Sequence, residues 1–334
     1  MSELGFDDRV VVITGAGRGL GKAYALLMGS LRARVVVNDP GAALDGSGLD
    51  PGPAERVVEA ITGAGGQAVA CTESVATPEG GRAIIAAALE RWGRIDALVH
   101  NAGNIAHRRL ADMTIEDFDA VLDVHLRGAF HVVQPAFTPM AEAGYGRIVL
   151  TSSIGGLYGN HGVANYAASK GGIIGLNNVV ALEGADRGIA SNVIVPGALT
   201  RIAAGADSRG MPESAGGSSS TRSSGSGSSG TGSSGSGGSA AAAAMTADNV
   251  APVVAWLSHE QCSVSGELFI AMAGRVARAF VGETPGVYQP EWTIDDVAAR
   301  IDEIRNLDSP WVFPVLPHGH ADHIRESLRL AEGD

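Results

Sequence analysis

Three side chains in the middle of the chain have types and spacing that suit proton chemistry: Ser153, Tyr166 and Lys170. Tyr166 and Lys170 stand four residues apart, so on a helix the phenol and the ammonium would share one face. An ammonium beside a phenol stabilises tyrosinate, so we expect the pKa of Tyr166 to fall below its ordinary value of about 10. Such a pair could exchange a proton with an alcohol or ketone oxygen, which the Ser153 hydroxyl would hold in line.

A glycine-rich loop near the start of the chain indicates a phosphate-binding turn. It reads Thr-Gly-Ala-Gly-Arg-Gly-Leu-Gly over residues 14–21, after the apolar run Val10–Ile13. Glycine lets the backbone approach a pyrophosphate without a Cβ clash, and a helix starting there would direct free N–H groups at it. Glycines cluster by chance in a chain with 47 of them, so the order of loop, acidic residue, serine and Tyr-x-x-x-Lys carries the prediction. The expected contacts in the loop are Gly15, Arg18, Gly19, Leu20 and Gly21.

Asp39 comes at the end of the second predicted strand, 18 residues after Gly21. A carboxylate there can accept hydrogen bonds from ribose hydroxyls and would repel a 2′-phosphate, which favours NAD over NADP. Arg18 favours NADP, because a guanidinium in the loop could pair with that phosphate. We take the carboxylate as the stronger discriminator. In the alternative interpretation, Asp39 is only a turn residue before Pro40 and Gly41.

The tripeptide Asn101-Ala102-Gly103 follows the predicted strand Ala97–His100. The carboxyl ends of parallel strands meet at one edge of a sheet, so this turn would pass the adenine side of a bound dinucleotide. Asn, Ala and Gly are also ordinary residues of strand-end turns. The tripeptide is therefore a cofactor contact only in combination with the glycine loop.

Short apolar strands alternate with helical stretches over most of the chain, which predicts a parallel sheet covered by helices on both faces. The expected strands are Val10–Thr14, Arg34–Asn38, Ala97–His100, Arg147–Ser152, Ala190–Val195 and Glu267–Ala271. The expected helices are Leu20–Leu31, Ala54–Thr62, Pro78–Trp92, Ile115–Pro139, Ala164–Asp186 and a stretch within Asp248–Ser258. The predicted fold class is α/β, with a single doubly wound parallel sheet of the Rossmann type.

A low-complexity insert over residues 205–244 interrupts this alternation. Ser218–Ser239 is almost entirely Gly and Ser, and Ala240–Ala244 is pure alanine. Such a composition buries too little apolar surface to offset the entropy of ordering, so we expect the insert to be disordered. The substrate loop expected at Leu199–Asp207 runs directly into it.

We expect two parts in the chain, a dinucleotide-binding catalytic domain over residues 1–274 and a helical C-terminal extension over residues 275–334. Helical patterns in the extension cover Ile294–Asn306 and Ile324–Leu330. Thr293 is the expected N-cap of the first, because its hydroxyl can accept from a free N–H group of the first turn.

Composition argues against several classes of protein. The 334-residue chain has a formal net charge of −12, whereas a nucleic-acid partner would favour a clustered basic face. No apolar run approaches the roughly 20 residues of a membrane span, and the acidic N-terminus lacks a signal-peptide pattern. The C-terminal Ala-Glu-Gly-Asp carries no peroxisomal address, and two cysteines are too few for a disulfide framework. We therefore expect a cytoplasmic enzyme.

The glycine loop followed by Ser153 and the Tyr166–Lys170 pair resembles the short-chain dehydrogenase/reductase family over the expected catalytic domain, apart from the insert. The resemblance implies an NAD(P)-dependent enzyme that interconverts a secondary alcohol and a ketone. It implies Ser153, Tyr166 and Lys170 as catalytic residues, with Lys170 also holding the nicotinamide ribose. It further implies that Pro196 and Gly197 flank the nicotinamide.

Two positions depart from the family pattern. His125 stands where the family usually has an asparagine that supports a proton-relay water. His125 could serve that relay or could be a buried structural histidine. The family's aspartate near the adenine appears here as Ser74, before Val75.

Several segments resemble one subgroup of the family, the (3R)-hydroxyacyl-CoA dehydrogenase unit of the type 2 peroxisomal multifunctional enzyme. They are Val124–Gly128, Tyr158–Asn160, Ala164–Tyr166 and the Val-Val-Asn-Asp that ends at Asp39, together with the extended tail. The resemblance implies NAD-dependent oxidation of a 3-hydroxyacyl thioester. It also implies a homodimer or homotetramer that pairs through the helices bearing Phe118–Pro139 and Tyr166–Glu183, with the tail adding to the dimer or covering the site.

Three alternatives stay open on the sequence. The chain could oxidise steroids or other secondary alcohols. It could also be a non-catalytic NAD-binding sensor or scaffold, although such a protein would have no chemical need for all three catalytic side chains. Finally, His318, His320 and His323 could hold a metal, although a solvated tail explains them more simply.

Overall fold

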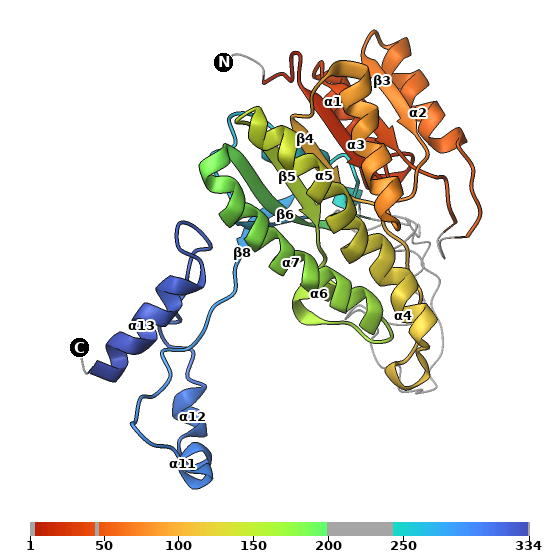
Figure 1. The fold of residues 1–334 in the computed structure, drawn as a ribbon. Helices are drawn as coiled ribbons and strands as arrows, with labels where there is room; N and C mark the ends of the chain where they lie inside the picture. Colours follow the sequence, from red (N-terminus) through yellow and green to blue (C-terminus); the bar gives the residue numbers. More distant parts are fainter. Residues whose placement is uncertain (1–3, 44–46, 199–242, 333–334) are drawn as a thin grey trace, which may run out of the picture.

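The computed structural model describes residues 4–43, 47–198 and 243–332 of the chain (Figure 1). Within them, one sheet of eight strands has the order β3-β2-β1-β4-β5-β6-β7-β8. Neighbouring strands pair in parallel from β3 to β7, and β8 pairs antiparallel with β7. The predicted α/β fold with a doubly wound, mostly parallel sheet is therefore confirmed.

The strands next to the centre of the sheet are short runs of apolar residues buried on both faces, as expected between two helix layers. Their bounds are β1 Val10–Thr14, β2 Arg34–Asn38, β3 Gln67–Cys71, β4 Ala97–His100, β5 Gly146–Thr151, β6 Ile189–Gly197, β7 Leu268–Met272 and β8 Arg275–Ala279. The six predicted strands are all present, with small shifts at their ends.

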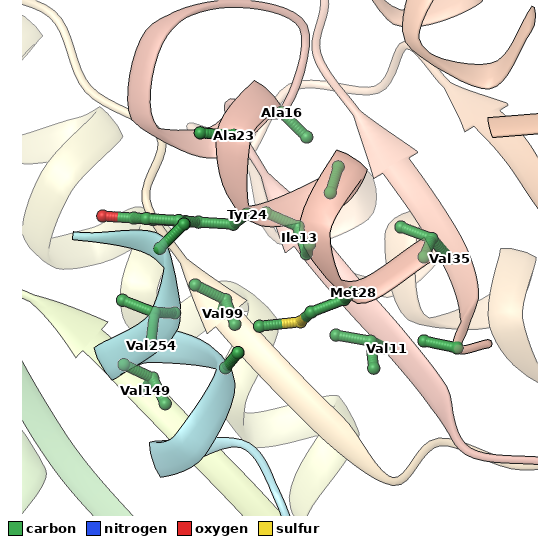
Figure 2. Packing of buried hydrophobic residues seen from close by; sticks show 14 of the residues in the cluster. Val11, Ile13, Ala16, Ala23, Tyr24, Met28, Val35, Val99, Val149 and Val254 are labelled. Atoms are coloured by element: carbon green, nitrogen blue, oxygen red, sulfur yellow. The ribbon is translucent and has the colours of Figure 1, made fainter. Parts of the chain in front are cut away.

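Alternate residues of β1 belong to opposite layers of the core. Val11 and Ile13 pack in the cluster of α1 (Gly19–Ser30), α2 (Gly52–Gly63) and α10 (Ala251–Leu257), part of which Figure 2 shows around Tyr24 and Met28. Val10 and Val12 pack in the other cluster, under α3 (Pro78–Trp92), α5 (Gly128–Glu142) and α7 (Ala164–Gly184). The two helix layers cover both faces of the sheet and leave its carboxyl edge free for the site.

Two strands and one helix break differ from the sequence prediction. No range was predicted for β3 or β8, because both carry exposed and half-buried residues at the sheet edges instead of a continuous apolar run. The predicted helix Ile115–Pro139 consists of α4 (Ile115–Leu122), the π-turn η2 (Asp123–Arg127) and α5. An extra residue in a π-turn does not alter the apolar pattern enough to be recognised in a sequence.

The remaining helices connect the strands or lie in the tail. They are η1 Leu110–Asp112, α6 Ile154–Tyr158, η3 Ala185–Arg187, α11 Ile294–Ala299, α12 Ile301–Ile304 and α13 His320–Glu332. Thr293 is the N-cap of α11, as predicted, and forms a capping box with Asp296. Figure 1 shows α11 and α12 projecting away from the sheet. Residues 205–242 of the predicted insert lie outside the described residues, and the division at residue 274 stays a prediction.

Candidate functional site

A cavity of about 450 Å³ lies at the carboxyl edge of the sheet, where the strand order reverses between β1 and β4. Ligands of open α/β sheets bind at such a reversal. The structure brings together most of the predicted cofactor residues there: Gly15, Arg18, Gly19, Leu20, Asp39, Ser74, Val75, Asn101, Ala102 and Gly103. The other residues predicted to contact the cofactor are not among the lining residues: Gly21, Tyr166, Lys170 and the Pro196-Gly197 segment at the end of β6.

The glycine loop is a cradle that only small residues can form. Gly15 has a φ of +63°, and a Cβ added to it would lie 2.8 Å from the Cα of Ala102. A Cβ on Gly21 would lie 2.2 Å from the carbonyl oxygen of Gly15. Helix α1 begins at Gly19, so its unpaired N–H groups face the loop. This arrangement fits the pyrophosphate of a dinucleotide, because the donors and the space are both present.

Backbone N–H groups hold the side chain of Asp39 through both of its carboxylate oxygens. Its Oδ2 accepts from the N–H of Gly17 at 2.8 Å, and its Oδ1 accepts from the N–H of Gly41 at 2.7 Å. Arg18 donates to the carbonyl of Ala42 at 3.3 Å, which turns its guanidinium toward the loop after β2. Both charged groups predicted to discriminate NAD from NADP therefore line the same cavity.

Ser153 follows β5 and is the N-cap of α6, where its Oγ accepts from the N–H of Gly155 at 3.1 Å. This bond fixes the side-chain rotamer and leaves the hydroxyl proton available for another acceptor. Ser153 also interacts with Tyr166 by a side-chain hydrogen bond that lowers the pKa of the phenol.

Tyr166 lies in the first turn of α7, which buried Asn165 fastens to the neighbouring segments. The Nδ2 of Asn165 donates to the carbonyl of Asp117 at 2.9 Å and to that of Ala106 at 3.2 Å, while its Oδ1 accepts from the N–H of Tyr166 at 2.8 Å. Burial raises the pKa of Tyr166, and this effect exceeds the lowering by Ser153. The prediction of a lowered phenol pKa is therefore wrong for these contacts, because desolvation outweighs them.

Lys170 lies one turn after Tyr166, with its Nζ 5.6 Å from the centre of the phenol ring. The ammonium donates to the carbonyl of Thr151 at 2.6 Å, and the residue is only 2% exposed. Burial lowers the pKa of Lys170 to about 7. The predicted proximity of the two side chains is confirmed, and burial disfavours the charged form of the lysine that would stabilise tyrosinate.

His125 lies in the π-turn and joins the cavity to the catalytic side chains. Its Nε2 lies 2.8 Å from the carbonyl oxygen of Asn104, and its ring packs edge-to-face on that of Tyr166 with centroids 5.2 Å apart. A Cβ on Gly103 would lie 2.5 Å from the His125 ring. Burial lowers the pKa of His125 well below its ordinary value, so the imidazole is neutral.

Sequence analysis missed five buried or half-buried side chains that position the site. They are Thr14, Asn38, His100, Asn104 and Asn165. The first three are the last residues of β1, β2 and β4. The available signal was a polar residue that ends an apolar strand, since a side chain there is at the carboxyl edge where ligands bind.

The histidines of the tail do not form a metal site in the described ranges, which contain no group of three His, Cys, Asp or Glu residues able to hold an ion. His320 and His323 line a separate cavity of about 370 Å³ between α7 and the tail. The Nε2 of His323 lies 2.9 Å from the Oε2 of Glu283. In the same ranges, no helix has the length and apolar character to cross a bilayer.

Comparison with known proteins identifies the family. A model described as short chain dehydrogenase matches residues 9–209. The chain is 38% identical to a Mycobacterium tuberculosis protein named as a short-chain type dehydrogenase/reductase, over 91% of this chain and 96% of that protein. It is 40% identical to the peroxisomal multifunctional enzyme type 2 of Mus musculus, over 83% of this chain but only 33% of that enzyme.

Solved structures agree with this result. The full-length peroxisomal multifunctional enzyme type 2 from Drosophila melanogaster superposes with a TM-score of 0.75 at 31% identity, covering 99% of this chain and 50% of that one. The family implies a nicotinamide cofactor, NAD or NADP, for which the glycine cradle and the adjoining cavity are suited. The chain therefore belongs to the short-chain dehydrogenase/reductase family and is an oxidoreductase that acts on a small molecule.

Proposed function

We propose that this protein is an NAD-dependent dehydrogenase that oxidises the hydroxyl of a 3-hydroxyacyl-CoA or a similar thioester. The observation that carries the proposal is the convergence of Ser153, Tyr166 and Lys170, with the ring of Tyr166 in contact with His125 and His125 in contact with Asn104 of the cavity wall. When bound, NAD supplies the hydride acceptor. The remaining chemistry belongs to the side chains of this chain.

Tyr166 exchanges the proton of the substrate oxygen. In oxidation its deprotonated oxygen takes the hydroxyl proton, and in reduction its phenol returns one. Ser153 donates to the same oxygen and holds it in line, because its own Oγ is fixed by the N–H of Gly155.

Lys170 supports the exchange as a proton carrier whose pKa is close to neutral pH. Its lowered pKa, about 7, allows it to take up and release protons near neutral pH. The carbonyl of Thr151 orients the Nζ group. The same residue would hold the nicotinamide ribose, as the family resemblance implies.

The carboxylate of Asp39 supports the choice of NAD over NADP. It lines the cavity and is anchored at both oxygens, so it has little freedom to move away from a 2′-phosphate. Arg18 is engaged with the carbonyl of Ala42 and would have to leave it in order to pair with that phosphate.

The substrate class rests on similarity to the peroxisomal multifunctional enzymes and on the subgroup resemblance of Val124–Gly128 and the tail. Oxidation of a steroid or another secondary alcohol is the second candidate, since the same side chains would serve it. The loop at Leu199–Asp207 expected to close over the substrate lies outside the described residues. The cytoplasmic location stays a prediction, as the named relatives in mouse and Drosophila are peroxisomal enzymes.

A homodimer or homotetramer is part of this proposal. Helices α5 and α7 lie beside each other on one face of the sheet and expose Phe130 and Val179, which are 54% and 50% accessible. Apolar side chains on two adjoining helices suit a helix-to-helix contact between copies of the chain.

Purified protein should form NADH with (3R)-hydroxyacyl-CoA substrates of several chain lengths, but not with the (3S) series. Tyr166→Phe should lower kcat by about 10²- to 10⁴-fold while NAD binding, measured by calorimetry, is retained. Tyr145→Phe is the matched control, since Tyr145 lies against Arg9 and Arg147, away from the catalytic side chains.

Oxidation of steroids or simple alcohols without thioester turnover would reject the acyl-CoA assignment and keep the family chemistry. NAD binding without turnover of any of these alcohols would instead favour the alternative of a non-catalytic NAD-binding sensor or scaffold.

Asp39→Asn removes the charge and keeps one acceptor oxygen for the backbone. The ratio of kcat/KM with NAD to kcat/KM with NADP should fall by about tenfold or more, because the like-charge repulsion is lost. Asp50→Asn is the control, since Asp50 lies 3.9 Å from Arg18 and does not line the cavity. An unchanged ratio in Asp39→Asn would contradict the assigned role.

Lys170 should make the stability of the protein depend on pH. Its folded-state pKa of about 7 is below the ordinary 10.5, so between these values the unfolded chain holds a proton that the folded chain has released. The free energy of unfolding should therefore rise with pH, by up to about 1.4 kcal/mol per unit. Denaturant unfolding at several pH values without added NAD measures this rise, which Lys170→Met should remove. Equal slopes in both proteins would contradict the lowered pKa.

The mass of the protein in solution, measured by light scattering, should equal two or four chains. A charge in the helix contact should reduce it, so Phe130→Glu with Val179→Glu should give a smaller species. The matched control is Leu49→Glu, because Leu49 is also exposed but lies at the cavity rim. A monomeric wild-type protein would reject the homo-oligomer.

A further inference from the structure

We propose that His100 is a positioning residue for the proton exchange at Tyr166, and that it acts through the π-turn that carries His125. His100 ends β4 and is 1% exposed, between the glycine-loop strand on one side and η2 on the other. Its Nδ1 lies 3.1 Å from the Oγ1 of Thr14, and its Nε2 lies 3.1 Å from the carbonyl oxygen of His125. The proposal rests on the proposed function.

The partners of the His100 ring determine its tautomer. Thr14 Oγ1 already accepts from the N–H groups of Asn101 and Ala102, both at 3.1 Å. Two accepted bonds use both lone pairs of the hydroxyl oxygen, so the hydroxyl proton is donated to Nδ1 of His100. The ring proton is then on Nε2, from which it is donated to the carbonyl of His125. A carbonyl oxygen can only accept, so both contacts agree on this tautomer.

The backbone of Asn104 holds the ring of His125. The Nε2 of His125 lies 2.8 Å from the carbonyl oxygen of Asn104 and 3.2 Å from its backbone nitrogen, so either tautomer of the ring keeps a hydrogen bond to Asn104. Its Nδ1 is buried and has no hydrogen-bond partner among the described residues. His100 thus holds the backbone carbonyl of His125, and Asn104 holds its side chain. Between these two anchors, its ring presents an edge-to-face contact to Tyr166.

The ring of His100 adds a donor to the π-turn. A π-turn departs from the regular hydrogen-bond ladder of an α-helix. The carbonyl of His125, in the middle of η2, accepts from the N–H of Gly128 and also from the ring of His100. Without that bond, the segment can relax toward regular α-helix, which rotates His125 away from Tyr166. A shift of about 1 Å at a catalytic group can cost on the order of 10²-fold in rate.

Loss of the His100 ring should affect turnover and leave cofactor binding intact. Thr14 would still accept from Asn101 and Ala102, so the cavity wall that these residues form would keep its bonds. This separation distinguishes a positioning role from general support of the fold, which would weaken NAD binding and turnover together.

The test compares His100→Leu and His100→Gln with wild type, using a substrate that the wild-type protein turns over. In His100→Leu, kcat should fall roughly tenfold to 10²-fold while the KM for NAD stays within about twofold. His100→Gln, whose amide can donate to the same carbonyl, should keep most of the wild-type kcat. The Gln variant also keeps the test possible if His100→Leu does not fold.

A double variant tests the route through His125. If His100 acts by placing that ring, His100→Leu should cause no further loss of kcat in a His125→Ala background. If the double variant loses kcat by the product of the losses in the two single variants, the proposal is overturned. An unchanged kcat in folded His100→Leu would also overturn it, as would a rise in the KM for NAD that parallels the fall in kcat. Absence of turnover in the wild-type protein would instead overturn the proposed function on which this inference rests.

Discussion

The hydroxyl of Thr14 joins the two central strands between which the sheet reverses its order. It accepts from the N–H groups of Asn101 and Ala102 and contacts the ring of His100. Without this oxygen, two N–H groups would lack an acceptor, and each buried unpaired group costs about 1–3 kcal/mol. The hydroxyl holds the turn after β4 close to Gly15. The two segments lie so near each other that a Cβ on Gly15 would clash with Ala102. The shape of the dinucleotide cavity therefore depends on one side chain at the end of β1.

Burial disfavours the charged forms of both Tyr166 and Lys170. The same desolvation raises the pKa of Tyr166 and lowers that of Lys170, so the neutral form of each is favoured. The pair has less charge at neutral pH than its spacing suggests. In return, Lys170 titrates near neutral pH, and the hydrogen bond from Ser153 favours the tyrosinate form. Burial therefore separates the proton affinities of the two side chains, with the pKa of Lys170 near neutral and that of Tyr166 above its ordinary value.

Much of the site could be predicted because its residues occupy the ends of predicted strands and the first turns of predicted helices. Gly15, Asp39 and Asn101 line one cavity for that reason. His100 and Asn165 could not be assigned, because their partners belong to segments far away in the chain. No range could be given for the edge strands β3 and β8, because they carry exposed and half-buried residues and lack the continuous apolar run of the central strands.

The amino-acid sequence is sufficient to identify the family, the alternation of strands and helices, and the side chains that can exchange a proton. These follow from local patterns: glycine spacing, apolar runs and the four-residue interval of Tyr166 and Lys170. The proton affinities of these side chains and the contacts that support them depend on how the chain packs in three dimensions. Desolvation depends on everything packed around a group, and the π-turn at His125 is held by a ring from another strand. Neither the desolvation of these groups nor the contact between His100 and the π-turn can be predicted from a local pattern, because both arise between distant segments of the chain.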